Sequence, residues 1–268
     1  MKKKKIINIL IGIISIMFCA IIISDKNLET IQTSSINSLN NKKIEWGVKR
    51  NDNHEQPNLG STNLQLINKY NGIAMGNNSD KYVYLTFDEG YEAGYTEKIL
   101  DVLKENDVKA TFFITGHYLN TAGDIVKRMI EEGHIVGNHT VNHKSMPDLT
   151  DEKVKEEVMR LQTAVFEKTG YEMKYIRPPK GELSERTLNI TNNLGFTTVM
   201  WSLAYDDWDE NKQGRTDYGK KKIIDNIHPG AVILLHATSK DNSEILDAVI
   251  KEIKNMGYEF KNIDNFQR

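Results

Sequence analysis

The sequence of 268 residues contains almost no cysteine: the only one, Cys19, lies inside an apolar N-terminal stretch. The rest of the chain therefore has neither a disulfide framework nor a cysteine-based zinc cluster. Any metal held by the folded part must be bound by nitrogen and oxygen ligands. No internal repeat is apparent along the chain.

The chain also lacks an excess of positive charge. Its formal net charge is −2, and part of its positive charge is the lysine run at residues 2–5, so the remainder is more acidic still. No basic stripe is left to bind a polyanion, which argues against nucleic acid as a partner. Nothing in the composition indicates a protein partner; the 27% charged and 39% hydrophobic residues are ordinary for a globular protein.

Residues 1–24 are the one long apolar run, and they begin with the lysines. A positive segment before roughly twenty apolar residues predicts an export signal or an uncleaved membrane anchor. The lysines are expected to stay in the cytoplasm, and the chain after Ser24 is expected to be extracytoplasmic. The sequence leaves open whether the protein is anchored in the membrane or secreted to the cell wall, because no clear cleavage site follows the run.

A polar linker and N-terminal extension is predicted over residues 25–69, which are rich in Asn, Ser, Thr and Lys. Strands and helices then alternate through a single predicted catalytic domain, residues 70–268. The predicted strands are residues 81–87, 110–115, 134–136, 174–177, 197–202, 231–236 and 259–263. The predicted helices are residues 95–105, 124–132, 151–168, 184–194, 220–227 and 243–256. This alternation favours an α/β barrel of about seven strands, with an open doubly wound sheet as the alternative.

Polar residues with chemical potential fall at the C-terminal ends of the predicted strands. They are Asp88, Glu89, His139, Arg177, Asp207 and His236. In a parallel barrel these ends converge on one face, where active sites are built. Their placement therefore favours the barrel over the open sheet.

His139 and His143 form the most specific pattern. Side chains at i and i+4 on one helical turn are neighbours, so both imidazoles are expected to bind one divalent metal. The missing ligand must be a carboxylate from elsewhere in the chain, and an open coordination position indicates a hydrolytic site. The alternative is a chance pair on a solvated helix.

Three further features suit acid–base chemistry, although each also has a structural interpretation. Asp88 and Glu89 are adjacent carboxylates, or simply acids of a surface loop. Arg177 precedes two prolines, so its guanidinium is held in one place and can keep a nearby carboxylate ionised. His236 becomes a general acid near neutral pH if an aspartate raises its pKa, and is otherwise a structural histidine.

Taken together, these residues resemble the motifs of the polysaccharide deacetylase family, that is, carbohydrate esterase family 4 or the nodulation-deacetylase homology domain. The motifs, in chain order, are Thr86-Phe87-Asp88-Glu89, His139-x-x-x-His143, Arg177-x-Pro179-x-Gly181, Asp207-Trp208 and Leu234-x-His236. Three longer runs, residues 86–92, 177–182 and 235–242, resemble more closely the branch that deacetylates N-acetylmuramic acid on the way to the muramic δ-lactam of the spore cortex.

The resemblance implies a distorted (β/α)7 barrel and a role for each matched residue. Asp88 is the implied general base, fixed by Arg177, and His236 the implied general acid, tuned by Asp207. His139, His143 and Glu89 are the implied ligands of zinc, or of cobalt or manganese. Implied substrate contacts are Lys180, Gly181 and Trp208.

This sequence departs from the family pattern at three places. Glu89 replaces the usual Asp ligand, and Ala204 stands where the fourth motif usually begins with an acid. Asp206 and Asp207 both become candidate partners of His236, and we favour Asp207 because it adjoins Trp208. Lys180 replaces a common aromatic residue, and we hypothesise that it pairs with the lactyl carboxylate of muramic acid; the alternative is a solvated loop lysine.

The function expected from the resemblance is therefore metal-dependent removal of acetyl from N-acetylmuramic acid in exported peptidoglycan strands. One alternative keeps this chemistry on N-acetylglucosamine of peptidoglycan or of chitin-type glycans. A second alternative is a glycan-binding module on an inactive barrel whose metal has been lost through Glu89.

Overall fold

The computed structural model describes residues 39–268. The predicted export segment, residues 1–24, lies outside them, as does the first part of the predicted linker. Contacts divide the chain into two units, Met1–Asn40 and Asn41–Arg268, and everything below concerns the second. No helix of the described part of the chain is long and apolar enough to cross a membrane. The predicted boundary at residue 70 stays a prediction.

A seven-stranded parallel sheet forms the centre of this unit. The strands are β2 (Tyr82–Glu89), β3 (Thr111–Ile114), β4 (Ile135–Asn138), β5 (Tyr175–Ile176), β7 (Thr197–Thr198), β8 (Ala231–His236) and β9 (Glu259–Phe260). Their order is β7-β5-β4-β3-β2-β8, with β9 paired to the start of β2. Leu203, downstream of β7, bridges to Ile233 of β8, so the two ends of the sheet meet through an isolated bridge. The predicted α/β fold, a distorted barrel, is confirmed, and the open sheet is excluded.

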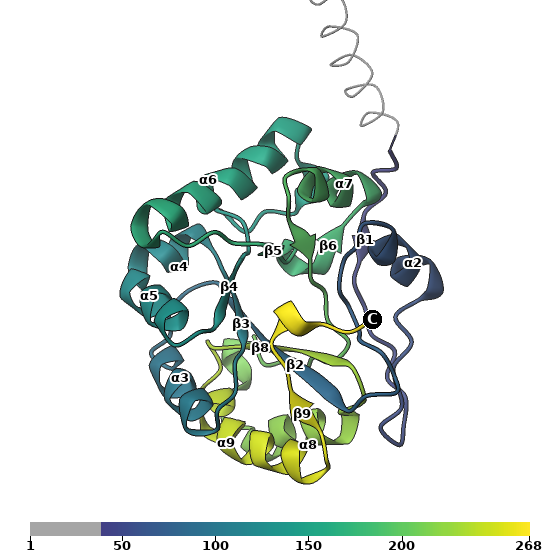
Figure 1. Ribbon diagram of the computed structural model, residues 1–268, viewed down its shortest axis with the longest axis vertical. Helices are drawn as coiled ribbons and strands as arrows, with labels where there is room; N and C mark the ends of the chain where they lie inside the picture. The colour runs from purple at the N-terminus through teal and green to yellow at the C-terminus, as the bar shows by residue number, and fades with distance from the viewer. Residues whose placement is uncertain (1–38) are drawn as a thin grey trace, which may run out of the picture. The chain divides into compact units, whose positions relative to one another are not determined.

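Helices lie around the outside of these strands (Figure 1). They are α3 (Thr96–Glu105), α4 (Gly116–Thr121), α5 (Gly123–Glu131), α6 (Asp151–Thr169), α7 (Glu185–Asn193), α8 (Thr216–Asn226) and α9 (Lys240–Asn255). The longest, α6, begins at Thr150, whose side chain accepts a hydrogen bond from the Lys153 amide as a helix cap. It ends at Gly170, which adopts the left-handed conformation at φ 71°.

The segment ahead of the barrel has structure of its own. It contains β1 (Ile44–Glu45) and the helix α2 (Ser61–Lys69). β1 pairs antiparallel with the two-residue strand β6 (Glu182–Leu183), which follows the Arg177 loop. Buried side chains of this segment, among them Trp46 and Ile67, share a hydrophobic cluster with residues of the barrel. Residues 41–69, read from the sequence as a polar extension, thus pack on the catalytic domain.

The strand β2 carries the acidic pair and sets its direction. It extends through Asp88 and Glu89, so both are strand residues rather than loop residues. Adjacent strand residues face opposite sides of a sheet, which sends the two carboxylates in opposite directions. In the parallel pairing with β8, Asp88 is the direct Cα partner of His236.

The predicted helix around the histidine pair is wrong. Asn138 belongs to β4, and residues 139–145 form an irregular loop. The Asn138 side chain accepts a hydrogen bond from the Thr140 amide, and the Thr140 hydroxyl accepts one from the His143 amide. Thr140 and His143 both adopt positive φ angles, 66° and 55°. These local bonds replace the helical ones and form a tight turn.

Candidate metal-dependent active site

A cavity of about 550 Å³ opens at the carboxyl ends of the strands. Sequence-predicted residues line it from several strands and loops: Asp88, His139, His143, Lys180, Gly181, Trp208 and His236. Arg177 is wholly buried and Asp207 almost so, and both bond to residues of this lining. The cavity is also lined by residues that the sequence did not single out, including Tyr91, Trp201 and Tyr205.

Asp88 is held as a carboxylate by Arg177. The Nη1 atom of Arg177 donates to Asp88 Oδ1 at 2.8 Å. The guanidinium itself is fixed because Nε donates to the Val199 carbonyl and Nη2 donates to the Thr86 hydroxyl. Its Cζ atom also lies 4.3 Å from the centroid of the Phe113 ring. Burial alone would raise the pKa of Asp88, but the charge of Arg177, aided by nearby histidines, lowers it. The carboxylate is therefore ionised at neutral pH and able to accept a proton.

His139 and His143 bring their Nε2 atoms to one point beside the cavity. The Nδ1 atom of His139 lies 2.8 Å from the Arg177 carbonyl, which requires Nδ1 to donate and leaves Nε2 unprotonated. The Nε2 atoms of the two rings are 3.1 Å apart. Burial is the largest cause that lowers the pKa of each ring, to about 4 for His143. Both rings are therefore neutral at pH 7, as metal ligands must be.

This pair fits a divalent transition metal. Two nitrogens at about 2.1 Å from one ion, with a ligand angle near 95–110°, lie roughly 3.1–3.4 Å apart, which matches the observed separation. The bond from His139 to a main-chain carbonyl is the outer support that metal-binding histidines usually have. Nitrogen donors of this kind suit zinc, cobalt and other late transition ions.

Glu89 is not brought to the histidines. Within residues 39–268, no group of three or more metal-binding side chains is present. The Glu89 carboxylate is completely buried, and neither oxygen has a hydrogen-bond partner. Its pKa is raised well above the ordinary value by burial and then by the charges of Glu92 and Asp88. Strand alternation explains the placement, because Asp88 takes the cavity side of β2.

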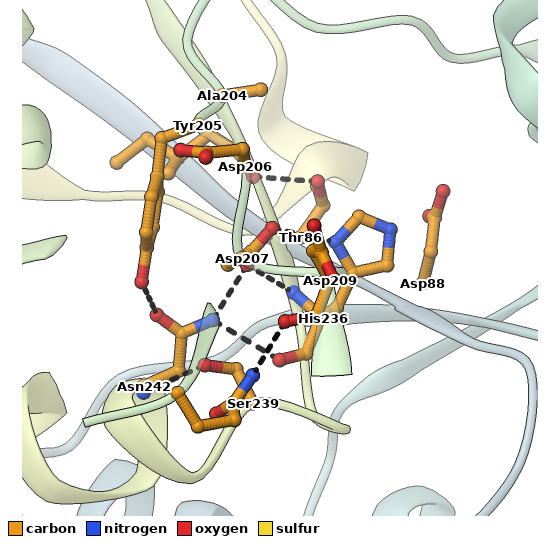
Figure 2. A network of polar contacts seen from close by, with 12 residues as sticks. Thr86, Asp88, Ala204, Tyr205, Asp206, Asp207, Asp209, His236, Ser239 and Asn242 are labelled. Carbon is orange, nitrogen blue, oxygen red and sulfur yellow. Dashed lines mark hydrogen bonds and ion pairs between the residues drawn. The ribbon is translucent and has the colours of Figure 1, made fainter. Parts of the chain in front are cut away.

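A second cluster supports His236 (Figure 2). Asp207 accepts two hydrogen bonds of 2.8 Å from His236, one from the main-chain amide and one from Nδ1 of the ring. Asn242 donates to Asp207 Oδ2 at 2.6 Å, and the Tyr205 hydroxyl donates to Asn242. Burial alone would lower the pKa of His236, but the Asp207 charge and hydrogen bond raise it. His236 is thereby suited to carry a proton that it can donate.

The structure distinguishes the two candidate partners of His236. Asp206 turns away from the ring and bonds to Lys212, Arg215 and Tyr218. Asp207 alone of the two reaches His236, although the acid usual at position 204 is absent. Sequence reasoning assigned no role to Asn242, even though it lies within the run 235–242 that matched the family branch.

The residues expected to contact substrate surround the cavity. Lys180 lines it with a left-handed backbone at φ 61°. Gly181, at φ 68°, has no room for a side chain: a Cβ atom there would lie 2.7 Å from the Trp201 ring. Trp208 is 62% exposed, so its ring is available at the rim of the cavity.

An ionised base on β2 and an acid on the neighbouring β8 suit hydrolysis assisted by a divalent cation. The polysaccharide deacetylase family model matches residues 75–199. The chain is 44% identical over 226 residues to the peptidoglycan-N-acetylmuramic acid deacetylase PdaA of Bacillus subtilis, covering 84% of this chain and 86% of that protein. This chain belongs to the polysaccharide deacetylase family and is a hydrolase of that family.

Solved structures agree with this assignment. The structure of Bacillus subtilis PdaA, a family 4 carbohydrate esterase, matches with a TM-score of 0.83 and covers 85% of this chain and 98% of that one. A family 4 pseudoenzyme from Bacillus anthracis is more distant: it is 28% identical, with a TM-score of 0.68, and the match covers 73% of this chain and 68% of that one. A peptidoglycan-N-acetylglucosamine deacetylase of Bacillus cereus is 34% identical over 203 residues, 74% of this chain and 73% of that protein.

Proposed function

We propose that this protein is exported and removes the N-acetyl group from N-acetylmuramic acid in peptidoglycan strands. The observation that carries the proposal is a cationic side chain, Lys180, in the lining of a deacetylase cavity. The 44% identity to an N-acetylmuramic acid deacetylase supports it. The freed amine lies near the lactyl carboxyl of the same sugar, so the product is expected to close to the muramic δ-lactam of spore cortex.

Two strand-end residues handle the protons of the reaction. Asp88, kept ionised by Arg177, accepts a proton from the attacking water as its oxygen bonds to the acetyl carbon. His236, kept protonated by Asp207, donates a proton to the amide nitrogen as the carbon–nitrogen bond breaks. The products are acetate and a free amine. The two residues are Cα partners across β2 and β8, which places them on the same region of the cavity.

His139 and His143 would hold the metal, with zinc the first choice and cobalt or manganese the alternatives. A bound divalent cation supplies Lewis-acid activation of water and of the acetyl carbonyl. We propose Glu89 as the third ligand, because a buried carboxylate without hydrogen bonds is stabilised by a nearby cation. Reaching the histidines requires the end of β2 to change its backbone conformation, because the strand directs the Glu89 side chain away from the cavity.

Lys180 is proposed to select muramic acid through its lactyl carboxylate. Within residues 39–268, the Lys180 ammonium makes no hydrogen bond or ion pair, so it is available to an anion. N-acetylglucosamine has no carboxylate to offer. Trp208 presents an exposed ring on which a sugar can stack, and Gly181 keeps the wall beside Trp201 open.

The test is to incubate the zinc-loaded protein with peptidoglycan glycan strands, with and without prior removal of the stem peptides. Mass spectrometry of the digested strands then identifies the sugar that has lost acetyl. Loss of acetyl, or of acetyl and water, from muramic acid in the peptide-free strands is the expected result.

The other outcomes separate the alternatives. Loss of acetyl from glucosamine alone would retain the chemistry and replace the substrate. An absence of product with zinc, cobalt and manganese alike would favour the inactive glycan-binding module.

The substitution Lys180→Gln tests the selectivity itself. We expect the KM for peptide-free muramic strands to rise about tenfold, because a charge-assisted hydrogen bond to the carboxylate is lost. Lys180→Arg keeps the charge and is expected to retain most of the preference. An unchanged preference for muramic acid in Lys180→Gln would contradict the role of this lysine.

A further inference from the structure

The segment Asn41–Gly47 lies against the loop that carries Lys180. β1 pairs with β6, placing Ile44 opposite Leu183 and Glu45 opposite Glu182. The Trp46 amide extends this pairing, since it donates to the Gly181 carbonyl at 2.9 Å. The loop is therefore bound along its length to a segment more than a hundred residues earlier in the chain.

Trp46 also connects this loop to Trp201 in the lining of the cavity. Its indole Nε1 donates to the carbonyl of Trp201 at 2.8 Å, and Trp201 lines the cavity. Gly181 lies between the two tryptophans: a Cβ atom there would be 2.7 Å from the Trp201 ring and 3.3 Å from Trp46 Cβ. Trp46 is 7% exposed, so these contacts are shielded from water.

The Lys180 backbone needs such support. Its φ of 61° is unfavourable for a residue with a side chain, and an unfavourable backbone persists only where the surroundings hold it. The two residues that follow it are not free to relax, because Gly181 is bonded to Trp46 and Glu182 belongs to β6. Contacts from the segment Asn41–Gly47, called the N-terminal segment below, thus hold the loop in the conformation that places Lys180 in the cavity lining.

Lys43 of the same segment binds two acids, Asp148 and Glu182, that the charge of Lys180 also affects. Its ammonium lies 2.7 Å from Asp148 and 3.2 Å from Glu182. The charge of Lys180 acts on both of these carboxylates as well. Lys43 and Lys180 are therefore two cations beside one pair of acids, and Lys43 is the one in contact with them.

We infer that Lys43 and Trp46 are positioning residues for substrate selection, an inference that rests on the proposed function. Trp46 holds the loop in the conformation that presents Lys180. Lys43 neutralises Asp148 and Glu182, so that the Lys180 ammonium stays directed at an anionic group of the substrate. The N-terminal segment, which precedes the part matched by the family model, is in this view part of the active site.

The first experiment is a double-mutant cycle on the full chain. Lys43→Gln is expected to raise the KM for peptide-free muramic strands about fivefold and to leave kcat within about twofold, since only an exposed charge pair is removed. In a Lys180→Gln background the same substitution is expected to change neither. Lys251→Gln, which removes another ion pair of 2.7 Å on α9, is the control and is expected to be silent. An equal KM change in both backgrounds would overturn the role of Lys43.

The second experiment requires no substrate, so it separates this inference from the proposed function. Trp46→Phe keeps an aromatic ring but removes the bond to Trp201. Hydrogen exchange of the peptide spanning residues 178–183 is expected to accelerate about fivefold, while exchange of β2 and β3 is unchanged. Unchanged exchange in residues 178–183 would overturn the inference even if muramic acid is the substrate. If glucosamine is the substrate, the proposed function fails, and accelerated exchange would still support the role of Trp46.

Discussion

The proposed base of this site is buried and the proposed acid is half-buried, and the protonation of each is set by one partner. Asp88 depends on Arg177, and His236 depends on Asp207. Burial alone would raise the pKa of Asp88 and lower that of His236, which disfavours the charged form of each residue. In both pairs the charge of the partner outweighs the effect of burial. The chemistry therefore depends as much on the partners as on the residues that touch the substrate.

Asp207→Asn is expected to change the pH dependence of the reaction as well as its rate. Asp207 raises the pKa of His236, so its removal lowers that pKa. The acid form of His236 is then lost at a lower pH, and the alkaline limb of the kcat profile moves toward lower pH. Asp206→Asn is the matched control, because Asp206 does not touch the ring. A lower kcat with an unmoved alkaline limb would contradict the assignment of His236 as the general acid.

The residues that meet at the site were easier to predict from the sequence than the contacts that surround them. Asp88, His139, Arg177 and His236 lie at or just beyond the end of a strand, and parallel strand ends converge, so their meeting was predictable. The role of Asn242 was not predictable from the sequence, because an asparagine at the start of a helix is usually interpreted as a capping residue. The position of Glu89 was not predictable either, since the orientation of strand β2 about its own axis decides which of its side chains face the cavity.

At the scale of elements, local signals gave most helices and strands, while non-local ones were missed. The buried strand β8 and the capped helix α6 have strong patterns of their own, and both were predicted. The two-residue strands β1 and β6 were missed because their pairing joins distant segments. The helix α2 lies in a polar stretch and is stabilised by packing rather than by its own pattern. The helix expected at the histidines is wrong because side-chain bonds of Asn138 and Thr140 form a turn instead.

The cap of α6 gives a prediction at this scale. Thr150→Ala removes the hydrogen bond to the Lys153 amide and is expected to lower the free energy of unfolding by about 1 kcal/mol. Urea denaturation measures this change, and kcat is expected to stay the same. Thr150→Ser keeps the hydroxyl and should restore most of the loss. Equal stability of the Ala and wild-type proteins would show that water caps the helix as well.

At the scale of the whole molecule, metal binding is expected to stabilise the fold. Zinc at 100 times its Kd adds about 2.7 kcal/mol, which corresponds to a Tm increase of roughly 5–10 °C for a protein of this size. A chelator should reverse the shift. His143→Ala is expected to abolish it, whereas His117→Ala, at an exposed histidine, should retain it. A shift that survives in His143→Ala would place the metal elsewhere.

Stability toward acid should reflect buried neutral histidines away from the cavity. His228 is 1% exposed, its Nδ1 lies 2.8 Å from the Asn226 carbonyl, and its Nε2 lies 2.9 Å from the Ser202 hydroxyl. Burial lowers its pKa to about 4. Because the unfolded chain takes up the proton below about pH 6.5, stability falls as the pH drops from 6.5 toward 4.

Between pH 7 and pH 5 this one residue is expected to cost roughly 2 kcal/mol. Urea denaturation at both pH values measures the loss, and His228→Gln should reduce it by a similar amount. A pH dependence that is the same in the variant would contradict the pKa assigned to His228.

Asp88 and His236 are paired across β2 and β8, so activity depends on whether these two strands have paired in the correct register. The separation of these two residues is set by backbone hydrogen bonds between strands whose segments are far apart in the sequence. A slip of two residues would keep every side chain on its proper face and leave the hydrophobic core chemically similar, yet His236 would then stand opposite Thr86. Such a molecule would resemble the native protein by circular dichroism and hydrolyse nothing. After refolding, the ratio of recovered activity to recovered folded protein would give the fraction of chains in which β2 and β8 paired in the correct register.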